Sequence, residues 1–114
     1  MNGSSLDLLQ GSLDVIVLKT LSWQPMHGFG IARWIQRVTD DAFQVEEGSL
    51  YPALYRMENK GWVKAEWGTT ENNRRAKYYR LTAAGRRQLT QSTDTWQKFA
   101  DAMSKIMRAA AQPA

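Results

Sequence analysis

The residue types that most often carry out chemistry in proteins are sparse in this chain. It contains a single histidine, His27, and no cysteine. One imidazole without a thiolate or a second imidazole cannot form an ordinary zinc site, and a chain without cysteine can form neither disulfides nor a thiolate nucleophile. No serine lies in a recognisable nucleophile motif with His27. We therefore expect a structural role for His27 near the start of a helix, and we expect no metal and no cofactor.

Two pairs of adjacent carboxylates, Asp40-Asp41 and Glu46-Glu47, are the other candidates for acid–base chemistry. Both fall at expected helix ends, where carboxylates commonly cap the helix or interact with its dipole. The segment Gly28-Phe29-Gly30 lacks the third glycine of a dinucleotide-binding motif, and we expect no strand before it. The sequence therefore predicts that the protein is not an enzyme.

Basic side chains gather in one segment, and this distribution indicates an anionic partner more strongly than the net charge of +4 does. No acidic residue lies between Asn72 and Arg87. Such a cluster suits DNA phosphates, although charges can also keep an exposed hairpin soluble. The basic residues of this segment are Arg74, Arg75, Lys77, Arg80, Arg86 and Arg87.

Two helices are expected in the first 38 residues, well before the basic segment. The first follows Gly11, with Ser12 as the N-cap and Asp14 in the first turn, and its apolar run continues to Leu21. The second spans residues 27–38. One face of this second helix carries Arg33 and Arg37, and another carries Ile31, Ile35 and Val38.

A third helix is predicted from Gly48 to Lys60, with Gly61 as the glycine that ends it. We expect Pro52 to be tolerated in the first turn. The core-facing positions are Leu50, Leu54 and Met57. Two tyrosines and a proline on the remaining faces favour a bound partner over a merely solvated surface. These other faces carry Ser49, Tyr51, Pro52, Tyr55, Arg56, Asn59 and Lys60.

A period of two after Gly61 predicts strands at 62–67 and 77–81, joined by a protruding polar tip at 68–75. Three helices followed by a hairpin give the order of a winged helix-turn-helix, with the third helix in the major groove of DNA. We expect an α+β fold that is mostly α, with residues 1–82 as the DNA-binding domain. The predicted DNA-binding residues are Ser49, Tyr51, Pro52, Tyr55, Arg56, Arg74, Arg75 and Lys77.

A long last helix, capped by Thr82, is expected in residues 83–114. Its large apolar residues recur at heptad spacing, interrupted at Ser92, which favours pairing with another helix over packing on its own domain. A tryptophan facing a two-fold axis could also line a pocket for flat apolar effectors, and Trp96 is that candidate. The predicted dimer interface consists of Leu89, Trp96, Phe99, Met103 and Ile106.

Four stretches of the chain resemble the PadR family of transcriptional regulators, and together they cover roughly residues 6 to 90. They are Gly11-Ser12-Leu13-Asp14, residues 26–31 (MHGFGI), residues 47–58 (EGSLYPALYRME) and residues 74–85 (RRAKYYRLTAAG). Two departures are mild: Met57 replaces the usual leucine, and Glu46-Glu47 adds negative charge before the third helix.

This resemblance implies a homodimer of winged-helix heads that represses transcription from pseudo-palindromic operators. Members often respond to phenolic acids or planar drugs. With one helix after the hairpin, the chain is similar to the short-tailed subgroup, in some members of which a tryptophan at the place of Trp96 helps to form an effector pocket.

The sequence thus predicts a homodimeric DNA-binding repressor that a small planar or phenolic effector can release. A winged helix that binds another protein and has no DNA site is the second hypothesis. Residues 1–10 lack a signal-peptide pattern, and no segment approaches the roughly 18 apolar residues of a membrane span. We therefore expect a cytoplasmic protein without a membrane partner.

Overall fold

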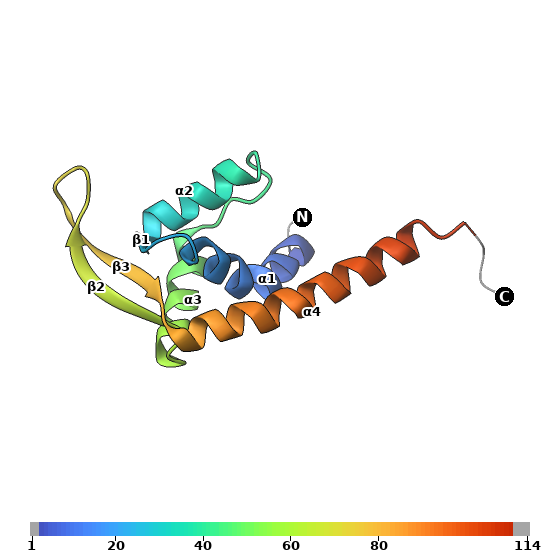
Figure 1. Cartoon of the computed structure of the whole chain (residues 1–114). Coiled ribbons are helices and arrows are strands. Elements are labelled where there is room, and N and C mark those ends of the chain that lie inside the picture. Colours follow the sequence, from blue (N-terminus) through green and yellow to red (C-terminus); the bar gives the residue numbers. More distant parts are fainter. Residues whose placement is uncertain (1–2, 111–114) are drawn as a thin grey trace.

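The computed structural model describes residues 3–110 and has the predicted order of elements (Figure 1). Within these residues, four helices accompany a small antiparallel sheet, which confirms the predicted winged helix-turn-helix class with a long C-terminal helix. The elements are α1 (Gly3–Leu21), β1 (Met26–His27), α2 (Gly28–Val38), α3 (Glu47–Asn59), β2 (Val63–Thr69), β3 (Arg75–Leu81) and α4 (Ala83–Met107).

Helix α1 begins at Gly3, well before the predicted start, so Ser12 lies inside the helix and is not its N-cap. A glycine in a helix interior costs about 1 kcal/mol relative to alanine, which is too little to end a helix that packs against α2, α3 and α4. The residues of α1 that enter the core are Leu13, Val17, Leu18 and Leu21.

Helix α2 is capped by His27, whose Nδ1 accepts a hydrogen bond from the backbone N–H of Gly30 at 3.0 Å. This contact confirms the structural role predicted for His27. On the predicted core stripe, Ile31 and Ile35 are buried, whereas Val38 is 56% exposed because it is the last residue of the helix.

The two-residue strand β1 contradicts the expectation that no strand precedes Gly28. Met26 pairs with Tyr79, and His27 pairs with Tyr78, in antiparallel register. Two residues are too few to show a period of two in the sequence. The strand forms because both residues pair with β3.

Helix α3 presents Leu50, Leu54 and Met57 to the core, each at most 1% exposed, as predicted. Gly61 ends the helix with φ at 78°, and the backbone N–H of Trp62 donates to the Met57 carbonyl in a Schellman motif. Pro52 is the sixth residue of α3 and therefore lies in the second turn, not the first. It is exposed, and its missing N–H removes one bond from the ladder.

The sheet has the order β1-β3-β2, and the β2–β3 hairpin protrudes from the head, which is the part of the molecule formed by α1–α3 and the sheet (Figure 1). The predicted tip at 68–75 is too long: Gly68, Thr69 and Arg75 belong to the strands. Thr70 and Arg74 close a three-residue loop in which Asn73 takes φ of 64°, a combination typical of a turn that ends in a left-handed residue.

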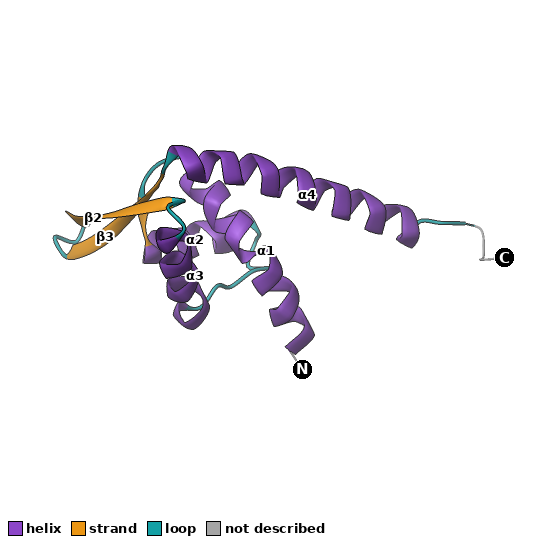
Figure 2. Cartoon of the chain, turned by 90° about the horizontal axis from the view of Figure 1, so that it is seen from below, coloured by secondary structure: helices purple, strands orange, loops and turns teal. Residues whose placement is uncertain are grey.

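Helix α4 begins at its predicted cap, where the Thr82 hydroxyl accepts from the Gly85 N–H at 3.0 Å. A Cβ on Gly85 would overlap the Trp62 carbonyl oxygen, so this glycine lets α4 approach the α3–β2 turn closely. The first turns of α4 pack on α1 and β3, and the rest projects away from the head (Figure 2).

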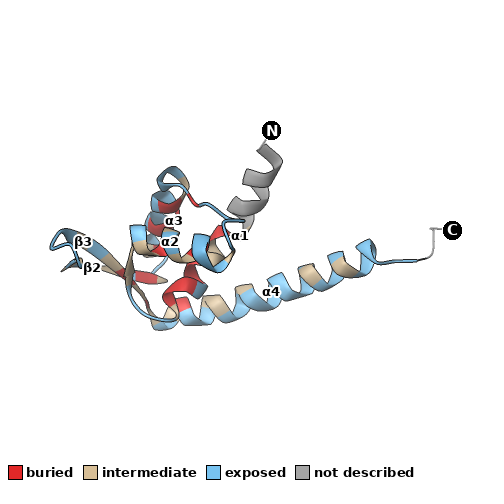
Figure 3. Cartoon of the chain, turned by 90° about the horizontal axis from the view of Figure 1, so that it is seen from above, coloured by how far each residue is buried: buried red, intermediate tan, exposed pale blue. Residues whose placement is uncertain are grey.

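The buried residues lie in the head, while α4 beyond its first turns is mostly exposed (Figure 3). Within residues 3–110, no helix is both long and apolar enough to cross a membrane.

Candidate nucleic-acid interface

The face of α3 that turns away from the core carries the side chains predicted to approach DNA. Tyr51 and Tyr55 are 43% and 67% exposed. Pro52 and Arg56 are exposed and Ser49 is partly buried. A helix of 13 residues that leaves such a row of side chains in solvent can enter a major groove.

Tyr51 is held by the start of α2. A Cβ on Gly28 would overlap the Tyr51 hydroxyl and ring, so the tyrosine lies directly on the backbone of that glycine. The buried Tyr79 is close by: burial raises its pKa, and Glu58 and Tyr51 raise it further. The first turn of α2 therefore helps to position a side chain of the exposed α3 face.

Arg56 is tied to α1 by an ion pair that the sequence analysis missed. Its Nη2 lies 2.9 Å from the Asp14 carboxylate, and the two side chains are 51% and 32% exposed. Asp14 was expected in a helix first turn, but α1 starts earlier and places it beside α3. No local pattern could reveal the pair, because 42 positions separate its members.

The hairpin presents its cations beside an exposed tryptophan. The Arg75 guanidinium lies 4.6 Å and the Lys77 ammonium 5.8 Å from the ring centroid of Trp67, which is 60% exposed. Side chains alternate along a strand, so Arg75 and Lys77 share the sheet face of the buried Tyr79. The exposed cations therefore continue the face that is turned toward the helices.

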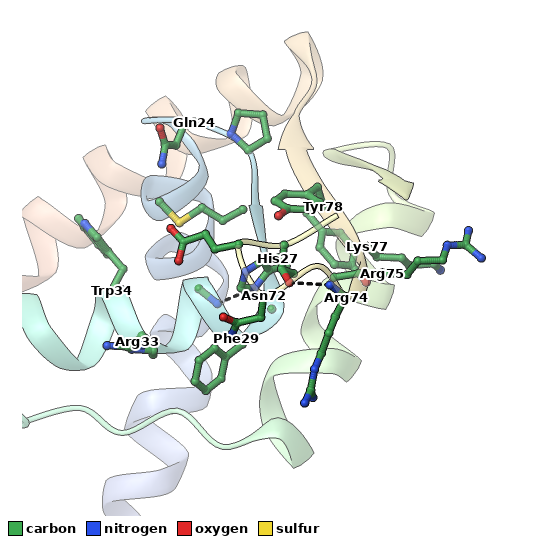
Figure 4. Close-up of a pocket in the computed structure, with 18 of the residues that line it drawn as sticks. Gln24, His27, Phe29, Arg33, Trp34, Asn72, Arg74, Arg75, Lys77 and Tyr78 are labelled. Atoms are coloured by element: carbon green, nitrogen blue, oxygen red, sulfur yellow. Dashed lines mark hydrogen bonds between the residues drawn. The ribbon is translucent and has the colours of Figure 1, made fainter. Parts of the chain in front are cut away.

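A groove of about 1130 Å³ separates α2 from this hairpin (Figure 4). Arg33 and Trp34 line it from α2, Arg74 and Lys77 line it from the hairpin, and Tyr51 joins it from α3. The groove therefore reaches the exposed face of the third helix at Tyr51. From the sequence, Arg33 was expected on a face of the second helix apart from the apolar stripe, and it was assigned to no site.

The predicted apolar stripe of α4 lies mostly in solvent. Trp96, Phe99, Met103 and Ile106 are 47%, 58%, 43% and 68% exposed. Leu89 differs, because it is partly buried and packs against the core of its own head.

Within the described part of the chain, no three His, Asp or Glu side chains come together in a way that could hold a metal ion. The carboxylate pairs lie at helix ends, as expected. Asp40 and Asp41 follow α2 in left-handed conformations, and Glu46 precedes α3 as its N-cap residue without a side-chain capping bond.

Comparison with known proteins places these features in a family. The sequence profile described as the transcriptional regulator PadR-like family matches residues 17–91. A solved transcriptional regulator from Clostridium thermocellum superposes with a TM-score of 0.79 at 30% identity, covering 87% of this chain and 96% of that one.

Two further relatives extend the comparison. A PadR family transcriptional regulator from Eggerthella lenta superposes with a TM-score of 0.77 at 28% identity, covering 95% of this chain and 92% of that one. A curated, uncharacterized protein of Lysinibacillus sphaericus is 29% identical over 101 residues, which are 89% of this chain and 93% of the relative.

Proposed function

Because the chain belongs to the PadR-like family of transcriptional regulators, we propose that it is a homodimeric repressor that a small planar or phenolic effector releases from its operator. Regulation of transcription through DNA binding follows from membership of the family. In our proposal, residues 1–82 form the DNA-binding domain and residues 83–114 the dimerisation helix.

One observation supports the DNA-binding surface most directly: Tyr51 of α3 and the hairpin cations Arg74, Arg75 and Lys77 line the same groove. Among the side chains of residues 12–110, the one ion pair is that of Arg56 with Asp14. The hairpin cations Arg74, Arg75 and Lys77 are therefore available to phosphate oxygens. Of the α3 residues, Ser49, Tyr51, Pro52, Tyr55 and Arg56 approach bases or backbone in the major groove.

Dimerisation is supported by the exposed stripe of α4. Complete burial of a large apolar side chain stabilises a structure by about 1.5–3 kcal/mol, and Trp96, Phe99, Met103 and Ile106 remain substantially exposed on one chain. Pairing two such helices covers the stripe and sets two α3 helices in successive major grooves, about one helical turn apart. That arrangement matches a pseudo-palindromic operator.

An effector site is proposed where the two Trp96 rings face each other across the dimer axis. A flat aromatic molecule can stack between such rings. It lowers DNA affinity if it binds better to the head spacing that does not fit the operator. The assay titrates planar and phenolic compounds into the protein–operator complex and follows tryptophan fluorescence together with the fraction of bound DNA.

The DNA-binding surface is tested by footprinting on the DNA upstream of the protein's own gene, followed by measurement of operator affinity between about 50 and 200 mM salt. We predict that Arg75→Ala weakens binding roughly equally on all DNA sequences and flattens the salt slope by about one unit for each protomer of the dimer. Lys98→Ala is the matched control, since Lys98 is exposed on α4 away from the hairpin.

Two results would contradict this proposal. An effect of Arg75→Ala confined to one base position would mean that Arg75 reads sequence and does not hold phosphate. If the wild-type protein fails to retard its own promoter fragment even at low salt, the winged helix serves as a protein-binding module instead.

A further inference from the structure

The groove between α2 and the hairpin contains basic residues that the DNA surface described above does not include. We propose that this groove holds the phosphodiester backbone that separates the major groove from the neighbouring minor groove, with Arg33 and Arg37 of α2 as phosphate ligands. The inference rests on the proposed function, because it requires α3 and the hairpin to grip the same duplex.

The lining of the groove is strongly basic. The groove lining includes a single carboxylate, that of Glu71 on the hairpin loop, and neither Arg33 nor Arg37 forms an ion pair with a side chain of residues 12–110. Like charges that face one another across a groove repel until an anion lies between them. The cations of the lining are Arg33, Arg37, Arg74, Arg75 and Lys77.

The shape of the groove points to a polymer of phosphates. Its two walls, α2 and the hairpin, diverge from β1, where His27 pairs with Tyr78, so the groove opens away from this pairing (Figure 1). An element in a major groove and an element at the adjacent minor groove lie on opposite sides of one sugar–phosphate strand. That strand must pass between α3 and the hairpin, and Tyr51 brings α3 to the edge of this same groove.

The two α2 arginines are placed to follow such a strand. They are four residues apart on one face of the helix, which corresponds to a rise of about 6 Å along the helix axis. One DNA strand carries a phosphate about every 3.4 Å along the duplex axis, so the two arginines can reach different phosphates of the same strand. The Arg33 guanidinium lies 5.5 Å from the centroid of the Phe29 ring. Stacking on a ring leaves the N–H edges of a guanidinium free for phosphate oxygens.

The start of α2 adds a favourable field. Gly28, Phe29 and Gly30 line the groove, so the positive end of the α2 dipole faces the space where we place the phosphates. His27 caps the Gly30 N–H and keeps this end of the helix fixed.

The test compares Arg33→Ala/Arg37→Ala with the matched double variant Lys98→Ala/Lys105→Ala, which removes the same charge from exposed positions on α4. The dissociation constant is measured at several salt concentrations on an operator fragment and on an unrelated duplex. Loss of two phosphate contacts in each protomer lowers the salt slope of the dimer by about 3.6. We expect this change for the α2 variant on both DNAs, and a much smaller change for the α4 variant. Arg33→Lys/Arg37→Lys should recover most of the slope, since the charges are restored.

Circular dichroism and thermal unfolding establish that each variant is folded. The inference is overturned if the α2 variant keeps the wild-type slope while Arg75→Ala reduces it, and in that case the proposed function stands. It is also overturned if an aromatic carboxylate such as 4-hydroxybenzoate binds the wild-type protein but not the α2 variant while the slopes are equal, because the groove would then be a small-molecule site. If the wild-type protein binds neither duplex, the proposed function itself fails.

Discussion

The head and the distal part of α4 both carry large apolar side chains at helical spacing, but those of the head are buried and those of distal α4 are exposed. Leu50, Leu54 and Met57 of α3 are at most 1% exposed, whereas Phe99 and Ile106 of α4 are 58% and 68% exposed. Apolar periodicity in the sequence therefore identifies the apolar face of a helix, but it does not indicate whether the rest of the same chain buries that face.

The difference follows from what surrounds each helix. Helix α3 packs against α1, α2 and β2, which together close one core. Helix α4 contacts α1 and β3 through its first turns, where Leu89 packs against that core, and then extends beyond every other element of the described chain (Figure 2). The large apolar residues after Leu89 thus stay exposed on the single chain.

The largest expected effect comes from a cavity in the head. Leu54→Ala should lower the free energy of unfolding by about 2–5 kcal/mol, because Leu54 is completely buried and its neighbours can collapse only partly into the space. Urea denaturation monitored by circular dichroism measures the loss. This loss should be similar at low and high protein concentration, and a loss below about 1 kcal/mol would show that α3 is not part of a tightly packed core.

A charge in the α4 stripe should have a different signature. Met103→Asp would place two carboxylates in an apolar dimer interface, and we expect the dimer dissociation constant to rise at least a hundredfold, or about 2.8 kcal/mol. Analytical ultracentrifugation over a range of concentrations measures the change, and the circular dichroism of the head should be retained.

Gln97→Asp is the matched control for this variant, because it adds the same charge at an exposed polar position of α4 away from the stripe. If Met103→Asp and Gln97→Asp dissociate equally, or if the wild-type protein is itself monomeric, the stripe is not a dimer interface and the contrast with the head disappears.

Local signals in the sequence were sufficient for some features. Thr82 as a helix cap and Gly61 as a helix end were correctly predicted, because the backbone groups that they satisfy lie within a few residues or require a left-handed glycine. Gly11-Ser12 has the same local appearance as a helix start, but tertiary contacts extend α1 through it.

Features that arise from distant partners were not predictable. Strand β1 exists because Tyr78 and Tyr79 pair with it, and the α2–hairpin groove exists because two elements that are far apart in sequence diverge from this pairing. The exposed face of α3 could be predicted from its period, whereas the contact of Tyr51 with Gly28 depends on how closely two helices approach.

The smallest effect is expected at the Asp14–Arg56 pair, which joins α1 to α3 at the border between core and solvent. Both side chains keep substantial exposure, so Asp14→Asn should cost about 0–1 kcal/mol of stability at low salt and less at 1 M salt, where exposed charges are screened. Urea denaturation at the two salt concentrations measures both values. A salt-independent loss of about 3–5 kcal/mol would instead indicate an effectively buried pair. Arg56 would then belong with the packed head, as an anchor of α3 on α1, and its assignment to the DNA-reading face would have to be withdrawn.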